Sequence, residues 1–190
     1  MRHHTSSLGR LGKLAAVAAL TAGVVAVPGT ANAASDVFRD ARGDMAGHGA
    51  DIHRVRVVNE DRIRVRVVHE NLRRSWKSNS SLTVYLDTDK RRTGPEFALI
   101  GGTFEGTDYA LVKTRNGWKQ GRRVESKDCE YGMTLDYGKE TATITMDRDC
   151  FGSPKAVRVA VKTGGELASG DIVRDWLGER RELTPWVRRG

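Results

Sequence analysis

Five arginines alternate with aliphatic residues in one short stretch of the chain. They are Arg54, Arg56, Arg62, Arg64 and Arg66. Alternate side chains of an extended strand share one face, so we expect these guanidinium groups on one side of a hairpin. Guanidinium groups bind phosphate and carboxylate groups with two parallel hydrogen bonds, which predicts a binding face for an anionic polymer. There are two alternatives to such a binding face. Acids on the next strand could neutralise the arginines, or the arginines could simply extend into solvent from the exposed face of an antiparallel sheet.

A second group of candidate ligands lies on a loop. Asp87 and Asp89 follow an apolar run, and Glu96 comes shortly after them. Calcium prefers such oxygen-rich loops, so a calcium site at Asp87 and Asp89 is one hypothesis. Three cations at 90–92 repel a divalent metal, and the spacing is not that of an EF-hand. A hydrogen-bonded turn is therefore the favoured interpretation, and no cofactor is expected. Further carboxylates that could join from the N-terminal part are Asp40, Asp44 and Asp51.

Catalytic signatures do not stand out in the sequence. The nucleophile-elbow, zinc-protease, P-loop and dinucleotide-binding patterns do not occur. His53 and His69 are isolated from nucleophiles, and a hydrogen-bonded histidine at a sheet edge explains each better than a catalytic base. The carboxylates from which a glycoside-hydrolase pair could be drawn are Glu96, Glu105, Asp108 and Asp136. At 29% charged residues any fold would supply such pairs by chance.

Aromatic residues offer another type of binding surface. The chain contains Trp76, Trp118, Trp176 and Trp186. Indole rings stack on sugar rings, but most tryptophan area in proteins is used for packing. Aromatic residues do not alternate with the arginines, which argues against single-stranded nucleic acid as the partner.

The arginines require a hairpin to present them. Residues 55–57 and 63–67 alternate valine or isoleucine with arginine, and a turn-like Asn-Glu-Asp triplet separates them. A three-residue loop pairs Val57 with Ile63 and Val55 with Val65. A slip of one residue would move every side chain to the wrong face, so the apolar pattern favours this register.

A second hairpin brings the two cysteines together. Tyr131, Met133 and Leu135 alternate toward Gly138, and the apolar residues of 142–146 alternate away from it. Pairing Leu135 with Ile144 places the chain's two cysteines, Cys129 and Cys150, directly opposite each other. Opposed strand residues have Cβ atoms about 4.5–5.5 Å apart, close to disulfide reach. We therefore predict a disulfide at the open end of this hairpin.

The remaining chain continues the pattern of short strands. Further candidate strands cover 82–87, 96–101, 107–113 and 156–162, with weaker ones near Val37 and Arg181. Helical turns are expected only around 70–76 and 171–177. Seven to nine short strands separated by turn residues predict an all-β fold, an antiparallel, jelly-roll-like β-sandwich with little helix.

The N-terminus carries the signature of an export signal. A basic start is followed by the apolar run LAAVAALTAGVVAV and the small-residue end Ala31-Asn32-Ala33. This pattern predicts a secretory signal peptide at 1–33, cleavage after Ala33 and one β-sandwich domain at 34–190. We expect a secreted, extracellular product without a membrane span. The full chain has 190 residues and a formal net charge of +8, and its composition excludes full disorder and collagen-like repeats.

Three segments resemble known families. They are GDMAGHGADIHRVRVV, VYLDTDKRRTGPEF and GTDYALV, in that order. They resemble small secreted proteins of high-GC Gram-positive bacteria without assigned function, and more distantly the β-sandwich of family-nine carbohydrate-binding and DOMON-type domains. The resemblance implies a sandwich fold. Some DOMON domains bind haem through Met and His, but nothing in this sequence places such a pair together.

These observations favour a non-catalytic binding module for an anionic or carbohydrate polymer of the cell surface. The alternatives are a small secreted hydrolase with an unidentified active site, and a structural or inhibitor-like secreted protein. The sequence specifies neither the ligand nor the oligomeric state.

Overall fold

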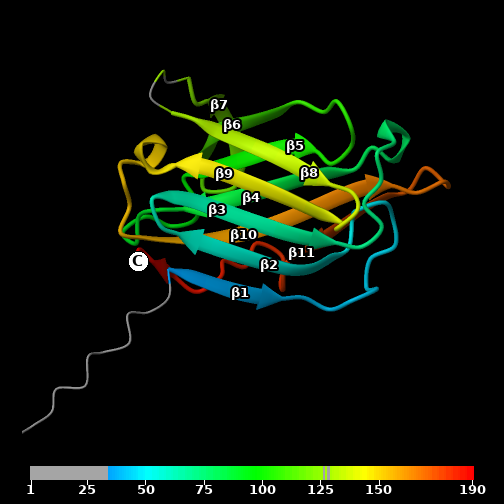
Figure 1. The fold of residues 1–190 in the computed structure, drawn as a ribbon, viewed down its shortest axis with the longest axis horizontal. Helices are drawn as coiled ribbons and strands as arrows, with labels where there is room; N and C mark the ends of the chain where they lie inside the picture. The colour runs from blue at the N-terminus through cyan, green and yellow to red at the C-terminus, as the bar shows by residue number, and fades with distance from the viewer. Residues whose placement is uncertain (1–33, 126, 128) are drawn as a thin grey trace, which may run out of the picture. The chain divides into compact units, whose positions relative to one another are not determined.

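The computed structural model describes residues 34–125, 127 and 129–190, and two antiparallel sheets account for most of this part of the chain (Figure 1). The first sheet has five strands, in the spatial order β1 (Ser35–Arg39), β2 (Ile52–Asn59), β3 (Arg62–His69), β9 (Thr141–Asp147) and β8 (Tyr131–Asp136). The second sheet has the order β11 (Ile172–Trp176), β10 (Ala156–Glu166), β4 (Ser81–Asp87), β5 (Phe97–Gly102), β6 (Tyr109–Arg115) and β7 (Lys119–Arg123), and β12 (Val187–Arg188) pairs with β10. Two short 3-10 helices, η1 (Trp76–Ser78) and η2 (Arg148–Phe151), complete the described elements.

This architecture confirms the predicted all-β sandwich class. The described residues form twelve strands, somewhat more than the seven to nine expected. The strand β7 was not predicted, and the segment expected to form a helical turn around 171–177 is instead the strand β11. The predicted signal peptide at 1–33 lies outside the described residues.

The core lies between the two sheets. Val55 and Val57 of β2 are fully buried, as are Val65 and Val67 of β3. They pack in one cluster with aliphatic residues of the second sheet, among them Val84, Leu99, Leu111 and Val159. Because the side-chain period of a strand is two, burial of these valines turns the arginines between them to the opposite face of the sheet.

The register of the first hairpin differs from the prediction by two residues. Val57 pairs with Val65, and Ile63 pairs with Asn59. Asn59 therefore belongs to the strand rather than to the turn. Its buried side-chain amide donates to the Val187 carbonyl at 2.9 Å, and its amide oxygen accepts from Arg148. These tertiary hydrogen bonds extend β2, and because the slip is even, each side chain keeps its predicted face.

The second hairpin shows the same two-residue difference. Leu135 pairs with Ala142, and Met133 pairs with Ile144. A register that pairs Leu135 with Ile144 also pairs Tyr137 with Ala142 and so extends the strand to Tyr137, whereas β8 ends at Asp136. The Asp136 carboxylate accepts from the backbone N–H of Lys139 at 3.0 Å, which closes a turn over 137–140.

The predicted disulfide is formed, but the two cysteines do not face each other on paired strands as expected. Cys129 and Cys150 are linked, with Cα atoms 4.8 Å apart. Cys150 does not lie opposite Cys129 on a strand, because β9 ends at Asp147 and Cys150 belongs to η2. A 3-10 helix rises about 2.0 Å per residue against about 3.4 Å in a strand, so the turn keeps Cys150 near the end of the hairpin.

Candidate functional site

The predicted arginines lie on the outer face of the five-stranded sheet. Arg56 of β2 is directly opposite Arg66 of β3, and Arg54 is opposite Arg39 of β1. We define the arginine face as the exposed arginines of these three neighbouring strands. Its members are Arg39, Arg54, Arg56, Arg64 and Arg66. Arg39 is not among the predicted arginines, although a strand near Val37 places it on this face.

Arg62 differs from the other predicted arginines because it is paired with acids. Its Nε lies 2.7 Å from Asp147 Oδ1, and its Nη2 lies 3.3 Å from Glu130 Oε2. It is half-buried at the end of the hairpin. Arg62 therefore acts as a structural ion pair, and we leave it out of the arginine face.

Acids do not cover the arginine face. Among residues 34–125, 127 and 129–190, no carboxylate lies within ion-pair distance of its five members. Arg56 Nη2 instead donates to the Ser35 hydroxyl at 3.2 Å. Like charges on directly opposed strand residues destabilise a sheet, so the Arg56–Arg66 pair has a cost that nothing on the described surface offsets.

The next strand places hydroxyl groups beside the arginines. Thr143 of β9 pairs with Arg66, and Thr145 pairs with Arg64. Thr134 of β8 is exposed beside Thr143. Threonine hydroxyls donate and accept hydrogen bonds without adding charge. The face therefore combines cationic and neutral donors, and the threonines, like Arg39, were not predicted as part of it.

A small hollow borders one end of the arginine face. It has a volume of about 250 Å³, and its lining includes Arg39, Arg42, Arg54 and Asp40. Three guanidinium groups therefore line this hollow together with one carboxylate, so the hollow carries a net positive charge next to the flat part of the face.

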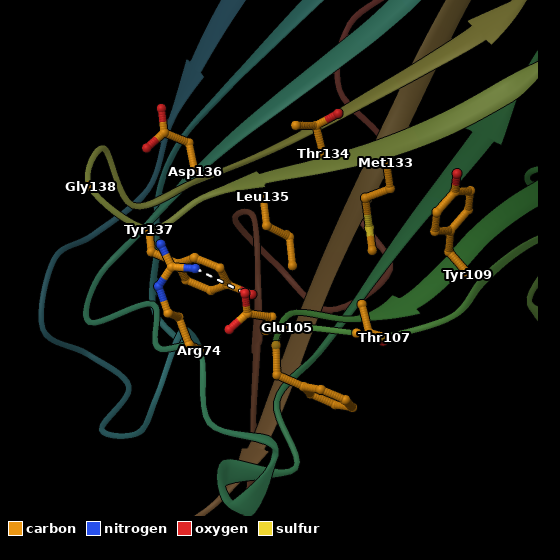
Figure 2. Close-up of a pocket in the computed structure, with 12 residues that line it drawn as sticks. Arg74, Glu105, Thr107, Tyr109, Met133, Thr134, Leu135, Asp136, Tyr137 and Gly138 are labelled. Atoms are coloured by element: carbon orange, nitrogen blue, oxygen red, sulfur yellow. Dashed lines mark hydrogen bonds and ion pairs between the residues drawn. The ribbon is translucent and has the colours of Figure 1, made fainter.

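A larger cavity lies elsewhere, at the end of β8. It is a groove of about 590 Å³, into which Met133 and Leu135 point (Figure 2). Arg74 Nη1 lies 3.2 Å from Glu105 Oε1, and the Arg74 guanidinium lies 4.7 Å from the centre of the Tyr137 ring. Tyr109 lines the groove farther along (Figure 2).

Two of the carboxylates considered for hydrolysis, Glu105 and Asp136, line this groove. Each faces a cation, since Glu105 is paired with Arg74 and Asp136 lies 3.0 Å from Lys139 Nζ. Hydrogen bonds from Lys139 lower the pKa of Asp136. A general acid in glycoside hydrolysis needs a raised pKa, so Asp136 does not have the property required of that acid. The other two carboxylates, Glu96 and Asp108, line different cavities.

The loop carboxylates considered for calcium already have cationic partners. Asp87 is fully buried, and its Oδ2 accepts from Arg158 Nε and Nη2 at 2.8 and 2.7 Å. Burial raises the pKa of Asp87, while Arg158 opposes that rise. Asp89 is paired with Arg91 Nε at 3.0 Å and also accepts from the Arg91 backbone N–H, which is the hydrogen-bonded turn considered above.

The tryptophans are used mainly for packing. Trp118 and Trp176 form a cluster with Tyr85 on the outer face of the second sheet, where ring centres lie 5.1–6.1 Å apart. Trp186 lies under the Arg158 guanidinium at 4.6 Å. Trp76 is the exception, since 70% of its surface is exposed.

The two histidines occupy different environments. His53 lies at an irregularity in the β2–β3 pairing, and its Nε2 is 3.3 Å from Asp51 and 3.2 Å from Glu70. His69 is fully buried, and its Nδ1 lies 2.9 Å from the Gly49 carbonyl. Burial lowers the pKa of His69 to about 4, so it is neutral near pH 7.

Comparison with known proteins gives no family assignment. No protein-family model matches the chain, and no curated protein matches it significantly. The resemblance to carbohydrate-binding and DOMON-type domains therefore stays a prediction. Within the part of the chain that the structure describes, no helix has the length and apolar character needed to cross a bilayer.

Proposed function

We propose that this protein is a secreted, non-catalytic module that binds an anionic polymer of the cell surface through its arginine face. The observation that carries this proposal is the set of five exposed guanidinium groups on three adjacent strands, without a carboxylate partner among the described residues.

The spacing of the arginines suits a repeating ligand. Neighbouring strands lie about 4.8 Å apart, and alternate residues along a strand lie about 6.7 Å apart. Arg54 and Arg56 follow one strand, and Arg64 and Arg66 follow the next. A flexible chain with regularly spaced phosphate or carboxylate groups can contact several such guanidinium groups at once. The threonines of β9 supply hydrogen bonds to the neutral parts of that chain.

Secretion is supported by two independent features. The N-terminal 33 residues have the basic, apolar and small-residue order of a signal peptide. The disulfide between Cys129 and Cys150 belongs to an oxidising compartment. A polymer of the cell envelope would then be within reach of the exported protein.

The test compares two variants with the same change in net charge. The face variant carries Arg56→Gln, Arg64→Gln and Arg66→Gln, and the control carries Lys119→Gln, Arg122→Gln and Arg188→Gln on exposed positions of the second sheet. Binding to polyphosphate and to a carboxylated polysaccharide is measured by titration at several salt concentrations.

We expect the face variant to bind much more weakly and to lose about one unit of the slope of log K against log salt for each contact removed. The control should retain both the affinity and the slope. Equal losses in the two variants would mean that only net charge matters, and the arginine face would then have no specific role.

The aromatic groove at the end of β8 supports a second candidate function, the binding of a neutral saccharide. Tyr109 and Tyr137 line it together with the Arg74–Glu105 pair (Figure 2). Phe104 also belongs to its lining. Aromatic rings stack on sugars, and paired charges hydrogen-bond hydroxyl groups. Saccharide binding that is insensitive to salt and lost in Tyr137→Ala would favour this groove over the arginine face.

A further inference from the structure

A cluster of aspartates lies where the connection between β1 and β2 meets β11. Asp44 and Asp51 belong to this connection, and Asp175 belongs to β11. Each contributes a carboxylate oxygen, and these oxygens all lie within 4.8 Å of one another. Asp51 is 1% exposed and Asp175 is 6% exposed, so two of the three carboxylates are removed from solvent.

The segment that connects β1 to β2 packs against β11 next to the aspartates. Gly47 has a φ of +136°, and a Cβ at this position would lie 3.1 Å from Val173 Cγ2 of β11. The Asp175 carboxylate accepts from the Ile52 backbone N–H at 2.8 Å, which links β11 to the start of β2. The cluster therefore joins an element of each sheet.

Two carboxylate oxygens at this site are buried without a hydrogen-bond partner. Asp51 Oδ2 accepts from the Gly43 backbone N–H at 2.7 Å, but Asp51 Oδ1 has no partner. The neighbouring Asp40 accepts from the Gly178 backbone N–H at 3.2 Å through Oδ1, while its buried Oδ2 also has no partner. A buried carboxylate oxygen without a donor is costly, so these atoms need a positive charge or a donor.

Positive side chains do not supply that charge. Within residues 34–125, 127 and 129–190, one basic side chain lies within ion-pair distance of these four aspartates. It is His53, whose Nε2 is 3.3 Å from Asp51 Oδ2. Burial raises the pKa of Asp175 to about 6, and the charges of Asp40 and Asp44 contribute to the rise. Burial likewise raises the pKa of Asp40. Apart from His53 beside Asp51, no ion pair among the described residues balances the carboxylates of this cluster.

We propose that this cluster is a calcium site, with Asp44, Asp51 and Asp175 as ligands and Asp40 as a fourth carboxylate at its edge. The donor set consists of oxygen atoms, which hard cations prefer. Calcium–oxygen distances are about 2.3–2.6 Å, so three oxygens that all lie within 4.8 Å of one another can reach a single ion. Magnesium demands a smaller and more regular octahedron.

The alternative set of Asp51, His53 and Glu70 would suit zinc, since it includes an imidazole. We favour calcium at the aspartate cluster because Glu70 is exposed to solvent and His53 already contacts both carboxylates. Zinc binding is kept as an outcome of the experiment.

The experiment uses the mature chain after removal of metal with EDTA and dialysis. Isothermal titration measures binding of Ca²⁺, Mg²⁺ and Zn²⁺, and thermal unfolding is followed with and without each ion. We expect one Ca²⁺ per chain with a Kd below about 1 mM, and a rise in Tm of about 5 °C at saturating Ca²⁺.

Two variants locate the site, and one serves as the control. Asp44→Asn changes an exposed residue, so it should leave the metal-free fold intact and weaken Ca²⁺ binding at least about tenfold. Asp51→Asn places an amide donor among the carboxylates, so the Tm in EDTA should equal or exceed that of the wild type while the response to Ca²⁺ disappears. Asp89→Asn removes a carboxylate of the other candidate loop and should leave Ca²⁺ binding unchanged.

Three results would overturn the proposal. One is the absence of both heat and a Tm shift at millimolar Ca²⁺. Another is Ca²⁺ binding that survives both Asp44→Asn and Asp51→Asn, or that is lost in Asp89→Asn. The third is a preference for Zn²⁺ that depends on His53. None of these results bears on polymer binding by the arginine face, so the two proposals fail or stand independently.

Discussion

The buried histidine provides a quantitative test of the structure. His69 is fully buried, and its Nδ1–H donates to the Gly49 carbonyl. Its Nε2 is buried without a partner, so a second proton there would have no acceptor. The folded protein therefore holds a neutral imidazole, with a pKa of about 4 against 6.5 for an unperturbed histidine.

The direction of the pH effect follows from these two values. Below about pH 6.5 the unfolded chain takes up a proton at His69, whereas the folded protein does so only near pH 4. Stability from this residue is therefore complete above pH 6.5, declines as the pH falls toward 4, and levels off below it. Each pH unit between the two pKa values changes the free energy of unfolding by about 1.36 kcal/mol, so the fall from pH 6.5 to pH 4 lowers it by about 3 kcal/mol.

The assay is urea unfolding between pH 7.5 and about pH 4, in EDTA, for the wild type and for His69→Asn. The asparagine amide can replace the Nδ1–H donor but does not titrate. The carboxylates titrate in both proteins, so their contributions cancel in the difference between the two unfolding free energies. We expect the difference in unfolding free energy between the two proteins to change by about 3 kcal/mol across this range, with the wild type losing more. A difference that is independent of pH would refute the assignment of His69 as a buried neutral group.

Three further predictions concern stability and are measured by urea unfolding. Arg56→Gln should raise the free energy of unfolding by about 0.5 kcal/mol at low salt, because it removes the repulsion between Arg56 and Arg66, and this gain should shrink at high salt. No gain at low salt would contradict the view that the charges of the arginine face repel one another without compensation. Replacing Cys129 and Cys150 by serine should lower the free energy of unfolding by about 3 kcal/mol, the value for a loop of about 20 residues, and an unchanged midpoint would speak against the disulfide. Arg148→Ala should lower the free energy of unfolding by about 3 kcal/mol, because the Asn59 amide oxygen and the Pro154 carbonyl lose their donor. Arg122→Ala, at an exposed position, is the control, and equal effects of the two substitutions would exclude a structural role for Arg148.

Local alternation was enough to predict which face the valines and arginines of the first hairpin occupy. Valines and arginines at alternate positions must point to opposite sides of any extended strand, whatever its neighbours are. The all-β class, the position of the arginines and the pairing of the only two cysteines follow from such short-range rules. The exact partners across each hairpin did not, because a slip of two residues preserves every face and its cost depends on remote contacts such as Asn59 with Val187.

Two functional features depended on the tertiary structure. The arginine face is open because its neighbour β9 presents threonines rather than acids, and the sequence does not specify that β9 pairs with β3. The aspartate cluster requires Asp175 to meet the connection between β1 and β2, a contact that spans 123 positions between Ile52 and Asp175. Periodicity reports only the direction of a side chain relative to its own strand, whereas charge compensation and metal coordination depend on which distant strands become neighbours.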